Sequence, residues 1–535
     1  MEVPQGYVVQ RSQSEDGSSS ETSRCTIQCA YHGWEFDSNG SCTHVPQQQT
    51  AASSSSKVPP IESYPVRSDA GMIWVWTDPS TSAFADILSL PISPLLRRFH
   101  AAHGDDAIYM RDLPYGVELL GENLLDLSHL PFSHHSVGTL NRDIGGPLPL
   151  RMLSEQEREC EAQWELEYAK HAAANDNGNN DNDKKENTAV VLPMFQVEVV
   201  DAPKHDPVFL GMKSRLTIPD NATCTIAFYD PCHVRYRRNI PGRGATHVEL
   251  FMTPTSAGRS RVVLFNVMES FLPPLADASS TTTKKEKTMT LRTKIRTSLS
   301  PSAIKSKIQK KIVTRLFNPV SSRGHIMSHS IFDGDGIFLN KQGDRMRRFG
   351  VSYKNYSTPT TADLLVNAYR RYLDKAASLT EQEGLNMVSD VVSYNTNMDT
   401  THGEREGGGG GGLHYVDVND RPNLLDRYES HTKHCPICLA DLAKLQKQHK
   451  YLNILQTAFI GAAGSSSTVL TAATTVSFLA RSSVVATVPA LLLTSSGLAS
   501  IFTICGALLA NRKKKKMDGK IQQFYFEDYV HAEKN

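Results

Sequence analysis

The chain has 535 residues, of which 39% are hydrophobic, and a formal net charge of +1. This length leaves room for more than one packed domain. The near-neutral charge argues against a nucleic-acid partner, which would need a basic surface. Nine cysteines without regular spacing argue against a secreted disulfide framework.

The first informative motif lies near the N-terminus, where Cys29 and His32 stand three residues apart and Gly33 follows. One tight loop therefore offers a thiolate and an imidazole. This mixed ligand set is that of a Rieske [2Fe–2S] centre, in which two histidines replace two cysteines on one iron. A zinc site also uses Cys-x-x-His, but the aromatic neighbours Tyr31 and Trp34 favour the Rieske interpretation.

A Rieske cluster needs two cysteines and two histidines, so a second Cys-x-His pair is required. Upstream of Cys29 only Cys25 is present, and His32 is the first histidine of the chain. Cys42 and His44 have the right residue types, but they follow the loop, and we do not expect them to be the pair. We therefore predict an incomplete Rieske domain and a natural protein that begins further upstream.

A second metal motif follows in the pattern Asp126-x-x-His129-x-x-x-x-His134. Asp126 and His129 would share one face of a helix at i, i+3. His134 would lie about 140° further around an ideal helix. Pro131 interrupts helical hydrogen bonding and lets the second histidine turn back. Two histidines and one carboxylate with open positions form the facial triad of non-heme Fe(II) oxygenases.

The carboxylate of this triad is predicted to come from the segment Asp333-Gly334-Asp335-Gly336. Asp335 is the preferred ligand and Asp333 is its rival. The alternative is an ordinary loop, because Asp-Gly is a strong turn signal. His135 lies next to His134, and spacing alone does not exclude it as a ligand.

Near the C-terminus, Cys435 and Cys438 form a Cys-x-x-Cys motif, which indicates a redox dithiol or half of a zinc site. His431 and His434 are the nearby candidates for completing a zinc site. Two inert thiols on a helix are the third alternative.

The residues that follow form two long uncharged spans, one on each side of Arg481. Each span exceeds the roughly 20 residues that cross a bilayer. Both are rich in small residues, which suit close helix packing in lipid. We predict a transmembrane helical hairpin whose far end is fixed by Lys513 to Lys516. A pair of buried soluble helices is the alternative.

The predicted fold class is α+β, with a small β domain, a mixed catalytic domain and a C-terminal hairpin. Two polar insertions, near 172–187 and 276–310, are expected to lie outside the core as disordered segments. The predicted segments are 1–80 (partial Rieske domain), 81–375 (catalytic domain), 376–430 (Gly-rich linker), 431–450 (Cys-x-x-Cys segment), 451–511 (two transmembrane helices) and 512–535 (basic flank and tail).

Several stretches together resemble the plastid family of Rieske-type mononuclear non-heme iron oxygenases. This group includes pheophorbide a oxygenase, chlorophyllide a oxygenase and a Rieske component of the inner-envelope import machinery. The resemblance runs along the whole chain and is carried by residues 29–46, 71–76, 123–134, 335–342, 361–374, 434–438 and 526–531.

The resemblance implies a helix-grip catalytic domain and a head-to-tail homotrimer, with Asp126 as the electron bridge at a subunit boundary. It implies a site residue by residue: Cys29 and His32 as [2Fe–2S] ligands, His129, His134 and Asp335 as ligands of a mononuclear Fe(II), and Cys435 and Cys438 as redox thiols.

The implied reaction is insertion of oxygen from O2 into an apolar, chlorophyll-derived tetrapyrrole, with electrons from a ferredoxin-type donor. The implied location is a plastid membrane, either the inner envelope or the thylakoid. Two alternatives remain open. One is a non-catalytic redox sensor or import component that uses the cluster and the thiols. The other is a degenerate relative that has lost its N-terminal ligands.

Overall fold

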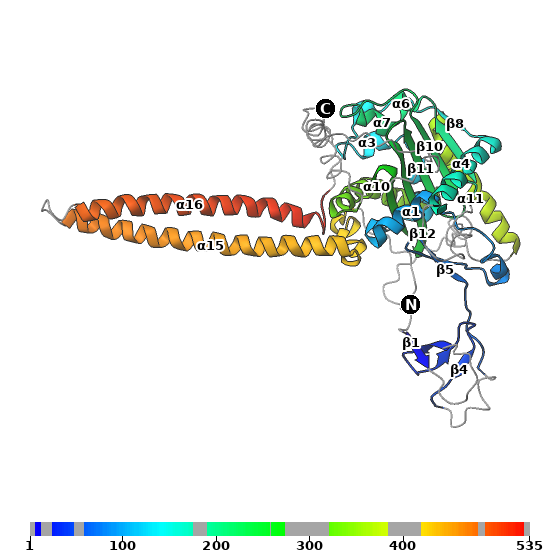
Figure 1. The fold of residues 1–535 in the computed structure, drawn as a ribbon, viewed down its shortest axis with the longest axis horizontal. Helices are drawn as coiled ribbons and strands as arrows, with labels where there is room; N and C mark the ends of the chain where they lie inside the picture. The colour runs from blue at the N-terminus through cyan, green and yellow to red at the C-terminus, as the bar shows by residue number, and fades with distance from the viewer. Residues whose placement is uncertain are drawn as a thin grey trace, which may run out of the picture. The chain divides into compact units, whose positions relative to one another are not determined.

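The computed structural model describes residues 6–11, 24–47, 58–174, 190–256, 258–272, 320–351, 353–383, 419–479 and 487–528. The chain divides into two compact units, Met1–Leu90 and Pro91–Asn535, which are drawn in Figure 1. Most of both predicted insertions and the glycine run of the linker lie outside the described residues.

The first unit is a small β structure. Strands β1 (Gly6–Arg11), β2 (Arg24–Cys29), β3 (Glu35–Phe36) and β4 (Cys42–His44) form an antiparallel sheet in sequence order. Strands β5 (Val66–Asp69) and β6 (Met72–Val75) pair separately, and the 3₁₀ helix η2 (Pro79–Phe84) follows. Gly33 adopts a φ of 74°, which suits glycine in the tight turn between β2 and β3.

The second unit contains a seven-stranded antiparallel sheet in the order β7-β13-β12-β11-β10-β9-β8. The predicted α+β class is therefore confirmed. The strands are β7 (Tyr109–Leu113), β8 (Leu150–Met152), β9 (Phe195–Val199), β10 (Thr223–Tyr229), β11 (His233–Ile240), β12 (Gly244–Ser256) and β13 (Arg259–Met268).

The helices of this unit are α1 (Pro94–His103), α2 (Val117–Leu125), α3 (Leu130–Ser133), α4 (Glu155–Ala174), α6 (Ala202–His205), α7 (Pro207–Met212), α10 (Ser322–Phe349), α11 (Leu364–Glu383), α13 (Arg421–Leu424), α14 (Arg427–Ser430), α15 (Pro436–Leu479) and α16 (Thr487–Gln522). The 3₁₀ helices of this unit are η3 (Gly104–Ala107), η4 (Arg142–Ile144), η5 (Glu269–Phe271), η6 (Tyr353–Asn355), η7 (Thr361–Asp363) and η9 (Thr432–His434).

Both faces of the sheet are covered, as neighbouring residues of β11 show. The hydroxyl of Tyr236 donates to the carbonyl of Leu124 on α2. Arg235, which points to the other face, pairs with Glu165 on α4 at 2.8 Å. Consecutive β11 residues are therefore buried, and the C-terminal end of α2 is fixed against the sheet.

The C-terminal helices α15 and α16 pack against one another, and His449 on α15 pairs with Asp518 on α16 at 2.8 Å. Within the part of the chain that the structure describes, none of the helices combines the length and the apolar composition needed to cross a membrane. The predicted transmembrane hairpin at 451–511 includes residues outside the described ones and stays a prediction.

Candidate metal centre

The motif that contains Asp126, His129 and His134 begins where a helix ends. Helix α2 stops at Leu125, and Asp126 has extended backbone angles of φ −101° and ψ 109°. Its carboxylate accepts a hydrogen bond of 2.7 Å from the backbone N–H of Ser128. This local bond competes with helix continuation. The predicted helical face shared by Asp126 and His129 is therefore wrong.

The helix resumes after this break as the single turn α3. His129 precedes its first residue, and Pro131 lies in its first turn, where proline costs no helical hydrogen bond. The break that reorients His134 thus lies before Pro131 and not at it.

The structure brings His129, His134 and Asp335 together. The Nε2 atoms of His129 and His134 lie 3.6 Å and 3.4 Å from Oδ1 of Asp335. The two imidazole rings are 5.2 Å apart between centroids. His134 and Asp335 are buried, whereas 18% of the His129 side chain is exposed. The set of two imidazoles and one carboxylate fits a mononuclear Fe(II) facial triad.

Asp335 reaches this place from the interior of a helix. Helix α10 runs from Ser322 to Phe349 through both Asp-Gly pairs, so the loop alternative is wrong. Its N-cap Ser321 accepts a hydrogen bond from the N–H of Gly324, and its C-cap Gly350 has a φ of 59°. These end signals define a long helix.

Two residues near the triad hold His129 in place. Asp126 Oδ2 lies 3.6 Å from Nδ1 of His129, and Asn123 Nδ2 lies 3.5 Å from its Nε2. Burial opposes protonation of His129, but the negative charges of Asp335 and Asp126 outweigh it and raise the pKa of His129. The surrounding carboxylates therefore stabilise positive charge, as a cation site requires.

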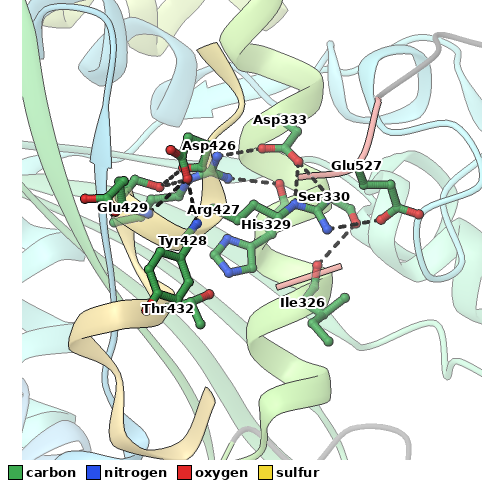
Figure 2. A network of polar contacts seen from close by, with 12 residues as sticks. Ile326, His329, Ser330, Asp333, Asp426, Arg427, Tyr428, Glu429, Thr432 and Glu527 are labelled. Atoms are coloured by element: carbon green, nitrogen blue, oxygen red, sulfur yellow. Dashed lines mark hydrogen bonds and ion pairs between the residues drawn. The ribbon is translucent and has the colours of Figure 1, made fainter. Parts of the chain in front are cut away.

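The rival aspartate has a different role. Asp333 is fully buried between two arginines: its carboxylate oxygens lie 2.7 Å from Arg111 and 2.7 Å from Arg427. Figure 2 shows Asp333 above Arg427, and Glu527 on the other side of the guanidinium at 3.1 Å. Because both of its oxygens are engaged in ion pairs, Asp333 belongs to a structural network and not to the triad.

His135 also lies outside the triad. Its Nδ1 accepts a hydrogen bond of 3.1 Å from the backbone N–H of Arg142. His135 is in neither of the two groups of described residues whose possible metal-ligand atoms lie close together.

In the first unit, Cys29 and His32 lie on the turn after β2. The N–H of Gly33 donates to the Cys29 carbonyl at 2.9 Å, and the Gln47 side chain donates to the His32 carbonyl at 2.8 Å. Cys29 is half-buried and His32 is exposed. Cys42 is buried in β4 and directs its thiol to the His44 carbonyl at 3.8 Å. The described residues thus supply one cysteine and one histidine of the two of each that a Rieske cluster requires.

Cys435 and Cys438 lie at the start of α15, both buried and unbonded to one another. His431 is close to them, as the sequence suggested, but His434 is exposed and not part of the group. The residue that sequence reasoning missed is His325 on α10, more than 100 positions away. Its only sequence signal is the pair His325 and His329 on one helical face at i, i+4.

The chain is similar in sequence to known proteins. The model of the "Rieske [2Fe-2S] domain" family matches residues 10–65. The chain is 24% identical over 521 residues to "Pheophorbide a oxygenase, chloroplastic" of Oryza sativa subsp. japonica, which covers 95% of this chain and 73% of the relative.

Shorter matches reach two further relatives. "Chlorophyllide a oxygenase, chloroplastic" of Arabidopsis thaliana is 39% identical over 110 residues, which are 21% of this chain and 18% of the relative. "Flavonoid 8-hydroxylase 2, chloroplastic" of Ocimum basilicum is 30% identical over 125 residues, which are 22% of this chain and 23% of the relative. In these two comparisons the chain spans less than a quarter of the relative.

Proposed function

We propose that this chain, which is similar to plastid Rieske-type oxygenases, inserts one oxygen atom from O2 into an apolar, chlorophyll-derived tetrapyrrole. The observation that carries this proposal is the convergence of His129, His134 and Asp335 from two separate segments on one point. A non-catalytic electron relay has no need for a second site of this kind, with open coordination positions.

The proposed reaction balances with two electrons and two protons. A C–H bond of the substrate becomes C–OH, one atom of O2 enters the product, and the other leaves as water. Ferrous iron, when held by His129, His134 and Asp335, would supply the reactivity toward O2.

The protein's own residues supply geometry and charge. Asp126 faces Nδ1 of His129, whereas Nε2 faces Asp335, and Asp126 orients the ring as residues behind metal ligands generally do. Burial of His134 and Asp335 keeps bulk water away from these two ligands. The role of Asp126 as an electron bridge stays a prediction, and its contact with His129 supports it.

The substrate proposal is supported by the relatives' names, which include a pheophorbide a oxygenase and a chlorophyllide a oxygenase. The flavonoid 8-hydroxylase among the relatives gives a specific second candidate, a flavonoid. A plastid location is supported by the chloroplast relatives. The ferredoxin-type donor and the homotrimer stay predictions that follow from the same resemblance.

The experiment uses the full chain loaded anaerobically with Fe(II) and supplied with hydrogen peroxide. Peroxide delivers the oxygen atom together with both electrons, so the test does not depend on a complete [2Fe–2S] cluster. Pheophorbide a, chlorophyllide a and a flavonoid are offered in parallel. We expect mass spectrometry to find a product heavier by one oxygen atom with one of the two tetrapyrroles.

His134→Ala is the matched variant, because it removes one of the three candidate iron ligands. It should abolish the product. Oxygenation of the flavonoid alone would replace the tetrapyrrole proposal with the second candidate. Equal turnover by wild type and His134→Ala would refute the oxygenase site itself.

A further inference from the structure

Four buried side chains gather at the start of α15, and we name them the Cys2His2 cluster: His325, His431, Cys435 and Cys438. One ligand atom of each lies within 4.8 Å of every other. Their exposed fractions range from 0 to 8%. They come from three separate elements, α10, the α14–η9 junction and the start of α15, so local sequence alone does not bring them together.

The spacing of these atoms matches the edges of one small tetrahedron. The Nδ1 atom of His325 lies 3.3 Å from the sulfur of Cys435 and 3.4 Å from that of Cys438. The Nε2 atom of His431 lies 3.4 Å from the sulfur of Cys438. With Zn–S near 2.3 Å and Zn–N of about 2.0–2.1 Å, a tetrahedral zinc ion places sulfur and nitrogen about 3.5 Å apart.

The same distances argue against a [2Fe–2S] cluster, although its ligand set is also two cysteines and two histidines. In a Rieske centre the thiolates bind one iron and the imidazoles bind the other, so two irons separate sulfur from nitrogen. Here each sulfur directly contacts an imidazole nitrogen. A single ion fits this arrangement.

A redox dithiol is the competing use of the pair. Reactive thiols of that kind are partially exposed, whereas Cys438 is fully buried and Cys435 nearly so. A dithiol also needs no pair of imidazoles from distant segments. The burial and the two histidines therefore favour a closed metal site.

The surroundings complete the coordination pattern expected for zinc. The Nδ1 atom of His431 lies 2.5 Å from the carbonyl of Met110 on β7, which fixes the ring and leaves Nε2 for a metal, as the outer shell of zinc sites does. Apolar side chains, including Leu442 and Phe524, pack around the two cysteines. They protect the site from solvent.

We propose that the Cys2His2 cluster binds one structural zinc ion that joins the C-terminal helices to the catalytic domain. His325 belongs to the same helix as Asp335, ten residues or about 15 Å along its axis, so this ion is separate from the iron centre. One ion would link α10, which carries an iron ligand, to the first residues of α15. The proposal goes beyond the oxygenase function and does not require it.

The test measures zinc in the full-length protein purified from zinc-supplemented cells. We expect about one zinc per chain in the wild type and a loss of at least tenfold in the double variant Cys435→Ser/Cys438→Ser and in His325→Ala. His434→Ala and Cys505→Ser are the controls, because both residues are exposed and lie outside the cluster. Both should keep their zinc.

A second measurement needs no variant and stays informative if the cysteine variants fail to fold. X-ray absorption at the zinc edge of the wild type should find two sulfur and two nitrogen neighbours. Zinc bound by oxygen and nitrogen alone, or a metal-free protein whose two cysteines cycle between thiols and a disulfide while it stays folded, would overturn the proposal. Iron bound at His129, His134 and Asp335 is counted separately, so failure here leaves the oxygenase proposal untouched.

Discussion

At the scale of residues, Asp333 and Asp335 are two positions apart on α10 and have opposite surroundings. Asp333 lies between Arg111 and Arg427, and no described histidine shares a metal-ligand group with it. Asp335 lies beside His129 and His134. On a helix, two residues separated by one position point about 200° apart. Asp333 therefore stabilises the fold on one face of α10, and Asp335 contributes to the metal site on the other face.

This difference gives a direct prediction. Asp333→Asn removes the buried carboxylate that Arg111 and Arg427 share and should lower the free energy of unfolding by about 3–5 kcal/mol. Asp335→Asn should leave the unfolding midpoint of the metal-free protein nearly unchanged and prevent iron binding. Thermal unfolding and iron analysis of both variants provide the check. Loss of iron in Asp333→Asn with unchanged stability would reverse the assignment.

A second prediction concerns pH. Burial raises the pKa of Glu118 from 4.5 to about 6. The folded state therefore binds this proton more tightly than the unfolded state, and stability falls as pH rises from about 4.5 to about 6. Glu118→Gln should stabilise the protein at pH 8 by roughly 1–2 kcal/mol and bring no gain at pH 4.

Chemical denaturation at the two pH values measures this effect. Glu159→Gln on α4 is the control, since that side chain is exposed, and it should change stability at neither pH. A gain from Glu118→Gln that is equal at both pH values would show that the ionisation of Glu118 is not its cause.

At the scale of elements, sequence signals located the candidate site residues but misjudged the backbone that holds them. Asp-Gly predicts a turn, yet Gly334 and Gly336 lie inside α10. Glycine costs a helix about 1 kcal/mol each, and the buried ion pairs of Asp333 together with the packing of Phe332 and Leu339 offset this. Such long-range compensation is not visible in a local pattern.

The close approach of α2 and α11 can be tested through one glycine. A Cβ atom at Gly121 would lie 2.5 Å from Cε1 of Tyr369, whose ring is in the core and only 2% exposed. Gly121→Ala should therefore destabilise the protein by about 1–3 kcal/mol through overpacking. Denaturant unfolding of the variant measures this directly.

Gly461→Ala is the matched helical control. An added Cβ at Gly461 meets no described atom within 4 Å, so this change should be neutral or stabilising by up to about 1 kcal/mol. If both variants were equally stable, the contact between α2 and α11 would be looser than the structure indicates.

At the scale of the whole molecule, the order of the structural segments along the chain was predictable from the sequence. The contacts between residues that are distant in sequence were not. The Cys29 and His32 loop, the α+β class and the pairing of His129 and His134 with a downstream aspartate all follow from spacing and residue type. The convergence of His325 with Cys435 depends on how α10 and α15 pack.

The central claim is a mononuclear ferrous site built from His129, His134 and Asp335 with open positions. Its most direct test is anaerobic Fe(II) loading of the full chain, followed by nitric oxide and electron paramagnetic resonance. We predict the high-spin signal of a ferrous nitrosyl adduct in the wild type, at about one iron per chain, and its loss in His134→Ala and in Asp335→Ala. An adduct of unchanged intensity in both variants, or none in the wild type, would contradict the claim.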